Sequence, residues 1–226
     1  YVIGSEDDNV YSKNFALIID LGGNDVYNGI KSMPYNISAI IDLAGNDSYN
    51  SAHYALGSGF FGIGILYDMA GDDIYQAGSF SLGAGAFGVG ILVDKEGNDR
   101  YFGDTFTQGA GGFGIGILKD LKGNDFYHGA LYAQGFGNTY GIGILADCEG
   151  NDTYFAGGKY LDEIRYSDHF LSLSQGFSIG FRPDLSSGIG LLTDLKGNDN
   201  YISDIFGQGC SYWYALGGLV DFEGND

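Results

Sequence analysis

The sequence predicts an all-β protein, a parallel β-solenoid (β-helix or β-roll) with about 26 residues in each coil. Three observations support this prediction. An Asp closes a hydrophobic segment at nearly regular spacing, the residue types around it recur from copy to copy, and Pro occurs only twice in 226 residues. Proline is scarce in chains full of paired strands because it cannot donate to a strand ladder.

The period is measured on the Asp that ends each hydrophobic segment. The copies are Asp20, Asp42, Asp68, Asp94, Asp120, Asp147, Asp194 and Asp221, with spacings of 22, 26, 26, 26, 27, 47 and 27 residues. A fixed period of this size is what one solenoid coil supplies. We expect one repeat domain over residues 1–226. Because the sequence starts and stops within a repeat, we also expect it to be a piece of a longer protein.

Each copy contains a strand, a turn and a second strand. "FGIGILYD" (61–68) alternates small and large residues with period two, which is typical of a strand with one buried face. A turn such as "KGND" (122–125) follows, where Gly and Asn tolerate positive φ and Asp accepts backbone N–H bonds. A Tyr then begins the second strand. The recurrence of whole residue types favours like residues stacked in parallel coils over the alternative, a series of antiparallel hairpins.

Charge and composition exclude some function classes. Asp and Glu number 29 against 10 Lys and Arg, a net charge of −19, and no basic cluster is present, so a nucleic-acid partner is not expected. No stretch of 18 apolar residues occurs, so no transmembrane helix is predicted. Cys148 and Cys210 lie in different repeats and do not indicate a disulfide framework.

A second Asp follows the first in every copy, and stacked coils would place both in ladders. Unit charges about 4.8 Å apart repel by about 3–4 kcal/mol at an effective dielectric constant of 20. Carboxylates in a glycine-rich turn suit Ca²⁺, the cofactor we expect. The predicted ligands are Asp20, Asp25, Asp42, Asp47, Asp68, Asp73, Asp94, Asp99, Asp120, Asp125, Asp147, Asp152, Asp194, Asp199, Asp221 and Asp226. The alternative is a turn that binds nothing because backbone amides satisfy its carboxylates.

The turns resemble a known family. "GGNDVY" (22–27) and "KGNDFY" (122–127) resemble the turn of the repeats-in-toxin calcium β-roll, which carries an aliphatic residue where this chain has Tyr. The resemblance implies calcium binding, although the period here is longer and each coil has one acidic turn instead of two. The whole chain is also similar to uncharacterised exported bacterial proteins with Gly-Asp-Tyr repeats, a likeness that implies no activity.

Two further residue types recur at fixed positions. We expect the tyrosines to stack into a ladder that stiffens the coils, with a carbohydrate-binding strip as the alternative if the ladder faces water. They are Tyr27, Tyr49, Tyr75, Tyr101, Tyr127, Tyr154 and Tyr201. We expect an amide ladder inside a turn from Gln108, Gln134, Gln175 and Gln208.

The spacing of 47 residues marks an insertion loop between coils, at 155–187. Insertions in solenoids form loops on one face, often the binding face. As an enzyme site, Glu163 and Asp168 would act as acid and base, and His169 and Arg182 would orient an anionic sugar. The alternative is a structural flap whose Arg165 and Arg182 pair with the acidic ladders.

These patterns together predict a calcium-stabilised structural or adhesive β-solenoid of a secreted or cell-surface bacterial protein. Its expected partners are calcium ions, copies of itself in a filament, or surface polysaccharide. Calcium outside the cell would neutralise the ladders, which would repel one another in a calcium-poor cytosol. The alternative function is a carbohydrate-active β-helix enzyme, a polysaccharide lyase or hydrolase, with its site at 155–187.

Overall fold

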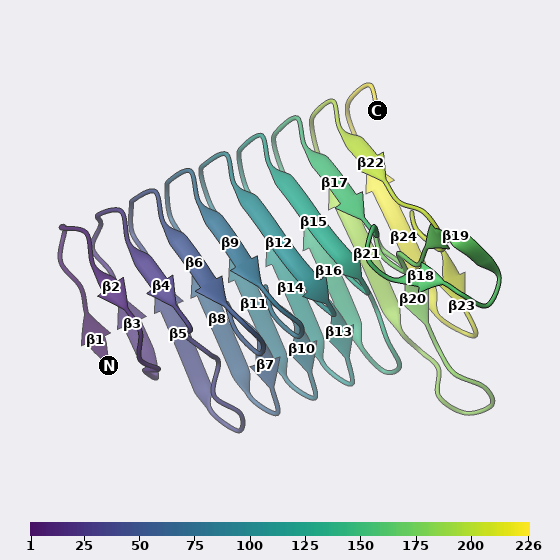
Figure 1. Ribbon diagram of the computed structural model, residues 1–226, viewed down its shortest axis with the longest axis horizontal. Coiled ribbons are helices and arrows are strands. Elements are labelled where there is room, and N and C mark those ends of the chain that lie inside the picture. Colours follow the sequence, from purple (N-terminus) through teal and green to yellow (C-terminus); the bar gives the residue numbers. More distant parts are fainter.

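The computed structural model describes residues 1–226 and consists of strands, turns and loops stacked as successive coils along one long axis (Figure 1). Strands from successive coils pair in parallel to form two long sheets that face each other. Each coil ascends through one sheet, turns, and returns through the other. None of its secondary structure is a helix able to span a membrane.

The first sheet has nine parallel strands in the order of the coils. They are β1 (Val2–Ile3), β3 (Leu17–Ile19), β5 (Ile37–Ile41), β8 (Ile63–Tyr67), β11 (Val89–Val93), β14 (Ile115–Lys119), β16 (Ile142–Ala146), β21 (Ile189–Asp194) and β24 (Leu216–Asp221). The register places like on like, because Gly64 pairs with Gly90 and Leu66 with Leu92. This parallel register confirms the predicted solenoid and excludes the series of antiparallel hairpins.

The second sheet has eight parallel strands and lies in front of the first in Figure 1. They are β2 (Val10–Tyr11), β4 (Val26–Asn28), β6 (Ser48–Ser51), β9 (Ile74–Ala77), β12 (Arg100–Thr105), β15 (Phe126–Leu131), β17 (Thr153–Ala156) and β22 (Asn200–Ile202). Its register stacks the tyrosines, for example Tyr75 on Tyr101 and Tyr127 on Tyr154.

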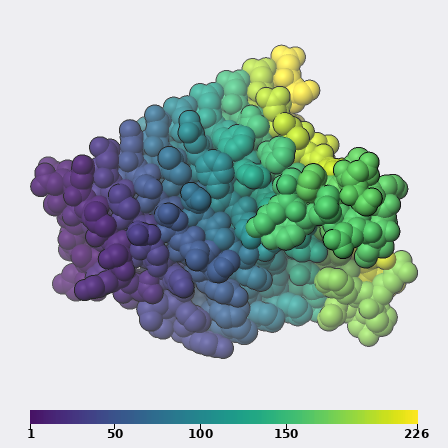
Figure 2. All heavy atoms as spheres, viewed as in Figure 1, coloured from purple at the N-terminus to yellow at the C-terminus, as the bar shows by residue number.

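Short strands close the third side of the coils. They are β7 (Gly59–Phe60), β10 (Gly85–Ala86), β13 (Gly111–Gly112), β20 (Ser178–Ile179) and β23 (Ser211–Tyr212). The insertion adds an antiparallel hairpin of β18 (Leu161–Asp162) and β19 (Tyr166–Phe170). In Figure 2 the insertion, in green, stands out from the body of the solenoid near its C-terminal end.

The core lies between the sheets and consists of a Leu or Ile column facing a Tyr column. Leu66 and Leu92 from the first sheet are fully buried, as are Tyr75 and Tyr101 from the second. Glycines such as Gly64 lie beside the leucines on the same inner side of the first sheet. A Cβ on Gly64 would stand 1.9 Å from the carbonyl oxygen of Ser58, so the backbone itself fills the interior there. The glycine side of "GIGIL" is therefore the buried side.

Candidate metal centre

The predicted metal ligands meet at one edge of the solenoid, where each first-sheet strand turns into the second sheet. We call this the acidic corner. It comprises a first Asp and a second Asp in each coil, and most are buried, with Asp68 at 0% and Asp73 at 1% exposure. Asp68 points inward because it shares the face of Leu66, two residues earlier in the strand.

The first Asp of each coil accepts a hydrogen bond from the Tyr of the preceding coil. Tyr75 donates its hydroxyl to Oδ2 of Asp94 at 2.5 Å, and Tyr101 donates to Oδ2 of Asp120 at 2.7 Å. Seven such bonds from Tyr27 onward measure 2.5–2.8 Å, and Tyr11 bonds Asp20 in the same way. The tyrosine rings stack 4.5–4.9 Å apart, which confirms the predicted ladder, but the ladder faces the core and not water.

The second Asp of each coil is only half satisfied. Its Oδ1 accepts the backbone N–H of the second Asp in the preceding coil, as Asp99 does from Asp73 at 2.6 Å. Its Oδ2 is buried and has no hydrogen-bond partner. These unpartnered oxygens belong to Asp25, Asp47, Asp73, Asp99, Asp125, Asp152 and Asp199. A buried polar atom without a partner costs about 1–3 kcal/mol, more if charged, so this row calls for a ligand or a proton.

The carboxylates gather in groups of three that each span two coils. Asp68 and Asp73 meet Asp94 of the next coil, and Asp94 and Asp99 meet Asp120, with the candidate ligand atoms of each group within 4.8 Å of one another. Two oxygens that each lie about 2.4 Å from one Ca²⁺ ion are at most about 4.8 Å apart, so the separations in each group are compatible with one shared cation. Asp42, Asp68, Asp94 and Asp120 each belong to two successive groups, which makes the sites one continuous row.

Burial raises the pKa of the second Asp in the seven coils from Asp25 to Asp199, and the charges of neighbouring carboxylates raise it further. The pKa rises to about 7 for Asp25, 8 for Asp47, 9 for Asp73, 11 for Asp99, 10 for Asp125, 9 for Asp152 and 6 for Asp199. Burial also raises the pKa of Asp94 to about 8, although the Tyr75 hydroxyl opposes this. The corner therefore holds either protons or a cation at neutral pH.

The first coil is the exception to this pattern. The strand register places Gly4 at the position of Asp20, and Asn9 at that of Asp25, so both carboxylates are missing. The space is closed as well, because a Cβ on Gly4 would stand 2.0 Å from Oδ2 of Asp20. Asn9 still donates its backbone N–H to Asp25 Oδ1 at 2.5 Å. The acidic row thus begins at the second coil.

Two polar ladders complete the coils. Each buried glutamine donates its side-chain amide to backbone carbonyl oxygens of two neighbouring coils, as Gln108 does to Tyr101 at 3.0 Å and His128 at 3.1 Å. The predicted amide ladder is therefore wrong in one respect, because the amides bond carbonyl oxygens and not one another. An exposed asparagine ladder, which the sequence reasoning missed, lines the outside of the turns; Asn124 bonds Asn98 at 3.0 Å through its side chain. Its signal was the Asn that recurs before the second Asp.

No hydrogen bond or ion pair joins the four residues of the alternative enzyme site. Glu163 and Asp168 are exposed and form no ion pair, whereas His169 Nδ1 lies 2.8 Å from Oδ1 of Asp204. The Asp204 carboxylate raises the pKa of the His169 imidazole. Arg182 lies on a separate loop, over the ring of Trp213.

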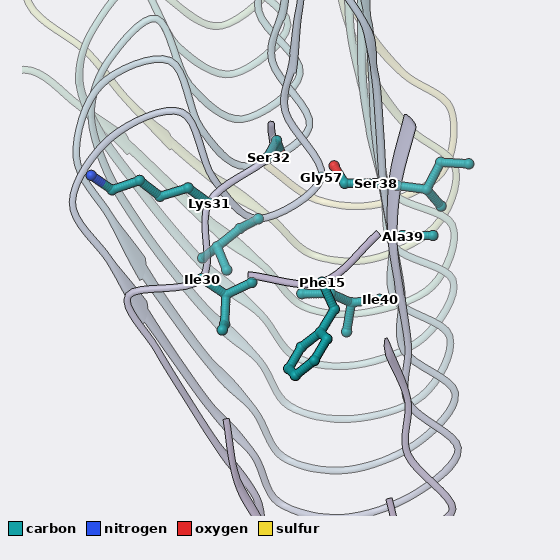
Figure 3. A pocket seen from close by; sticks show the side chains of 10 residues that line it. Phe15, Ile30, Lys31, Ser32, Ser38, Ala39, Ile40 and Gly57 are labelled. Atoms are coloured by element: carbon teal, nitrogen blue, oxygen red, sulfur yellow. The ribbon is translucent and has the colours of Figure 1, made fainter. Parts of the chain in front are cut away.

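The insertion does not reach the acidic corner. Arg165 pairs with Asp162 and lies over the ring of Phe206, so neither insertion arginine pairs with the acidic ladders, contrary to the predicted flap. Elsewhere, a cavity of about 10 Å³ lies between Phe15, Ile30 and Ile40 near the N-terminal coils (Figure 3). It has room for about one water molecule and does not constitute a substrate site.

No protein-family model, curated protein or solved structure matches this chain. The resemblance of the turns to calcium β-rolls therefore rests on the short turn motif alone. The site itself is defined by the geometry of the acidic corner.

Proposed function

We propose that the protein is a calcium-stabilised structural rod that works outside the bacterial cell, as a secreted or surface-attached element. One observation supports this proposal above all: the row of buried carboxylate oxygens without partners that runs from coil to coil. A catalytic protein needs a cleft with converging reactive groups, whereas this row lies inside the wall of the solenoid.

The role of the cation follows from which coils its ligands come from. An ion held by Asp94, Asp99 and Asp120 would join two neighbouring coils and neutralise the charges that repel them. Carboxylates are hard oxygen ligands, and the buried groups contain no His or Cys, so Ca²⁺ fits better than Zn²⁺. A chain of this kind would fold where calcium is abundant and remain loosened where it is scarce.

An extracellular location is supported by this calcium argument and by the likeness to exported repeat proteins. Adhesion to surface polysaccharide would use the exterior of the rod, since the tyrosine ladder is buried. The outer side of the second sheet offers aromatic rings for such contacts, including Phe102 and Phe126, whose centroids lie 5.8 Å apart.

The test is to measure bound metal and thermal stability on the same sample. Protein dialysed against calcium should contain several Ca²⁺ ions per chain by mass spectrometry of the metal. Excess chelator at pH 8 should lower Tm by more than about 10 °C, because each lost kcal/mol shifts Tm by about 2–4 °C in a chain of this size. Magnesium at equal concentration is the control and should restore less, since it needs six ligands in strict octahedral geometry. An unchanged melt together with no bound metal would show that the corner is satisfied by protons.

A further inference from the structure

The outer side of the first sheet is almost wholly apolar. Because glycines and leucines face inward, the alternate residues of each strand face outward in three columns. The columns are Ile37, Ile63, Val89, Ile115, Ile142, Ile189 and Leu216; Leu17, Ala39, Ile65, Ile91, Ile117, Ile144, Leu191 and Gly218; and Ile19, Ile41, Tyr67, Val93, Lys119, Ala146, Thr193 and Val220. We call this surface the outer apolar face.

The chemistry of this face differs from that of the rest of the molecule. Its only charged side chain is Lys119, although the chain carries 29 acidic residues. Its side chains are partly exposed to solvent, because neighbouring coils cover the rest of each one. Ile37 is 63% exposed, Ile63 38% and Ile115 37%. No buried core requires Ile or Val at these positions, because the glycine side of the strand already packs against the backbone.

No other part of the chain covers the outer apolar face. The insertion hairpin lies toward the second sheet, on the opposite side of the solenoid from this face (Figure 1). Contacts confirm its position, because Lys159 and Tyr160 reach Asp104 in β12 of the second sheet. A strand of five residues is about 17 Å long, and the seven spacings of about 4.8 Å between the eight strands of the columns span about 34 Å, so the face covers about 570 Å².

An area of this size lies at the upper end of the range of about 300–600 Å² found for the largest apolar patch of a typical monomer, a patch that is often functional, and below the roughly 800 Å² that each partner buries in a standard complex. An adjoining row of exposed aromatics widens it. Phe61, Phe87 and Phe113 stack 4.8 and 4.9 Å apart at the edge of the sheet, with Tyr140 next in the row.

We propose that the outer apolar face docks a second copy of this chain, sheet against sheet. An identical face has the same spacing between its rows of side chains, so the ridges of one copy fit the grooves of the other along the whole length. Although the chain is strongly acidic, the outer apolar face has no acidic side chain, so two copies paired through it bring no carboxylates together within the face. The pairing concerns the exterior and holds whether or not the acidic corner binds metal.

Charge also selects the orientation of the pair. A two-fold axis along the strands would place the acidic corner of one copy over the acidic corner of the other. A two-fold axis along the solenoid places each acidic corner over the aromatic row of its partner, formed by Phe61, Phe87, Phe113 and Tyr140, and aligns the coils in the same order. The second arrangement avoids like-charge repulsion between the corners. It brings each coil opposite its own copy.

The first test is the mass of the protein in solution. Light scattering should give twice the 24.1 kDa of one chain. The double variant Ile91→Asp with Ile117→Asp places two carboxylates in the centre of the face and should weaken dimerisation by at least about 100-fold. Ile74→Asp, at a residue 41% exposed on the second sheet, is the matched control and should remain a dimer. A monomeric wild-type chain at 100 μM, or a dimer insensitive to the double variant, would overturn the proposal.

The second test avoids reliance on destabilising variants and reports the orientation. Packed sheets lie about 10 Å apart, too far for a direct disulfide, so a short bis-maleimide is the appropriate cross-linker. Ala39→Cys in a Cys148→Ser, Cys210→Ser background should cross-link with itself, and Ile202→Cys on the second sheet should not. No cross-link at Ala39 in a dimeric chain would overturn the two-fold axis along the solenoid, and flotation of a monomeric chain with phospholipid vesicles would contradict pairing of two copies through this face.

Discussion

The first coil and the coils after it share one fold but differ at the acidic corner. Strand β2 pairs with β4 as later strands do, and the Tyr11 ring stacks on Tyr27 at 4.8 Å. Yet Gly4 and Asn9 stand where later coils have two aspartates. Strand pairing and tyrosine stacking in the first coil therefore do not need carboxylates of its own, although Tyr11 and Asn9 still donate to Asp20 and Asp25 of the second coil. The presence of the carboxylates in every later coil calls for another cause.

Whatever keeps these aspartates in the later coils must offset the free-energy cost of burying their carboxylates. In the first coil the Asn9 side chain bonds within its own turn, to the Ser5 hydroxyl at 3.2 Å. In later coils an unpartnered oxygen such as Oδ2 of Asp99 is buried among other carboxylates. Either a proton or a cation offsets the charge there, and the two differ in their response to pH. Three changes separate them and test the comparison between the first coil and its neighbours.

The largest expected effect is the pH dependence of the metal-free protein. The pKa values of Asp99, Asp125 and Asp152 are raised to about 11, 10 and 9, far above the value near 3.9 of an unfolded Asp. The stability that these groups contribute is complete below pH 4 and is lost as the pH rises toward their folded pKa values. Between pH 5 and 8 the loss is on the order of 10 kcal/mol, enough to unfold a domain.

The measurement is thermal or urea unfolding in chelator from pH 4 to 9. The metal-free protein should be most stable at the acidic end. With calcium the dependence should reverse, because protons compete with the ion for the carboxylates. A constant Tm from pH 5 to 8 in the metal-free protein would mean that the buried carboxylates are ionised at no cost in folding free energy. The first coil and the later coils would then not differ in the free energy of the acidic corner.

A smaller effect is expected from Asp99→Asn, which gives a central coil the residue that the first coil has at Asn9. In chelator at pH 8 the amide removes a carboxyl that the fold must keep protonated, and it should stabilise the protein by about 2–4 kcal/mol. In calcium it removes a ligand and should destabilise the protein by a similar amount. Urea unfolding in the two buffers measures both values.

The matched control is Asp72→Asn, the same change one residue before Asp73, in the exposed ladder outside the turn. Asp72 accepts hydrogen bonds from Asn98 and lies in solvent, so its variant should differ from wild type by less than about 0.5 kcal/mol in either buffer. The same sign for Asp99→Asn with and without calcium would count against an ion at the corner.

The sequence predicted the fold class, the period and the positions of both aspartates because these depend on recurrence. The inward direction of Asp68 was not predicted, although the spacing contains it, since Leu66 and Asp68 lie two residues apart and share a face. The bond from Tyr75 to Asp94 was missed because it joins residues of neighbouring coils, and only the register of the stack makes them partners.

Two other features depended on packing that a linear pattern does not contain. Large residues alternating with glycine suggest buried isoleucines, but here the backbone at Ser58 approaches Gly64 so closely that Ile63 and Ile65 must face outward. The insertion arginines were expected at the acidic ladders because of their charge. They stack on aromatic rings, Arg165 on that of Phe206, because the insertion folds toward the last coil and not toward the corner.

The smallest expected effect comes from Tyr101→Phe, which separates hydrogen bonding from ion binding at the corner. The ring stack remains, but Oδ2 of Asp120 loses the hydroxyl that donates to it at 2.7 Å. Stability should fall by about 1–2 kcal/mol, while the calcium content stays that of the wild type. Tyr67→Phe, whose hydroxyl lies on the outer apolar face, is the control and should change stability by less than about 0.5 kcal/mol. Loss of an ion from Tyr101→Phe would instead make the tyrosine ladder part of the metal site, and Tyr11 would then extend that site into the first coil.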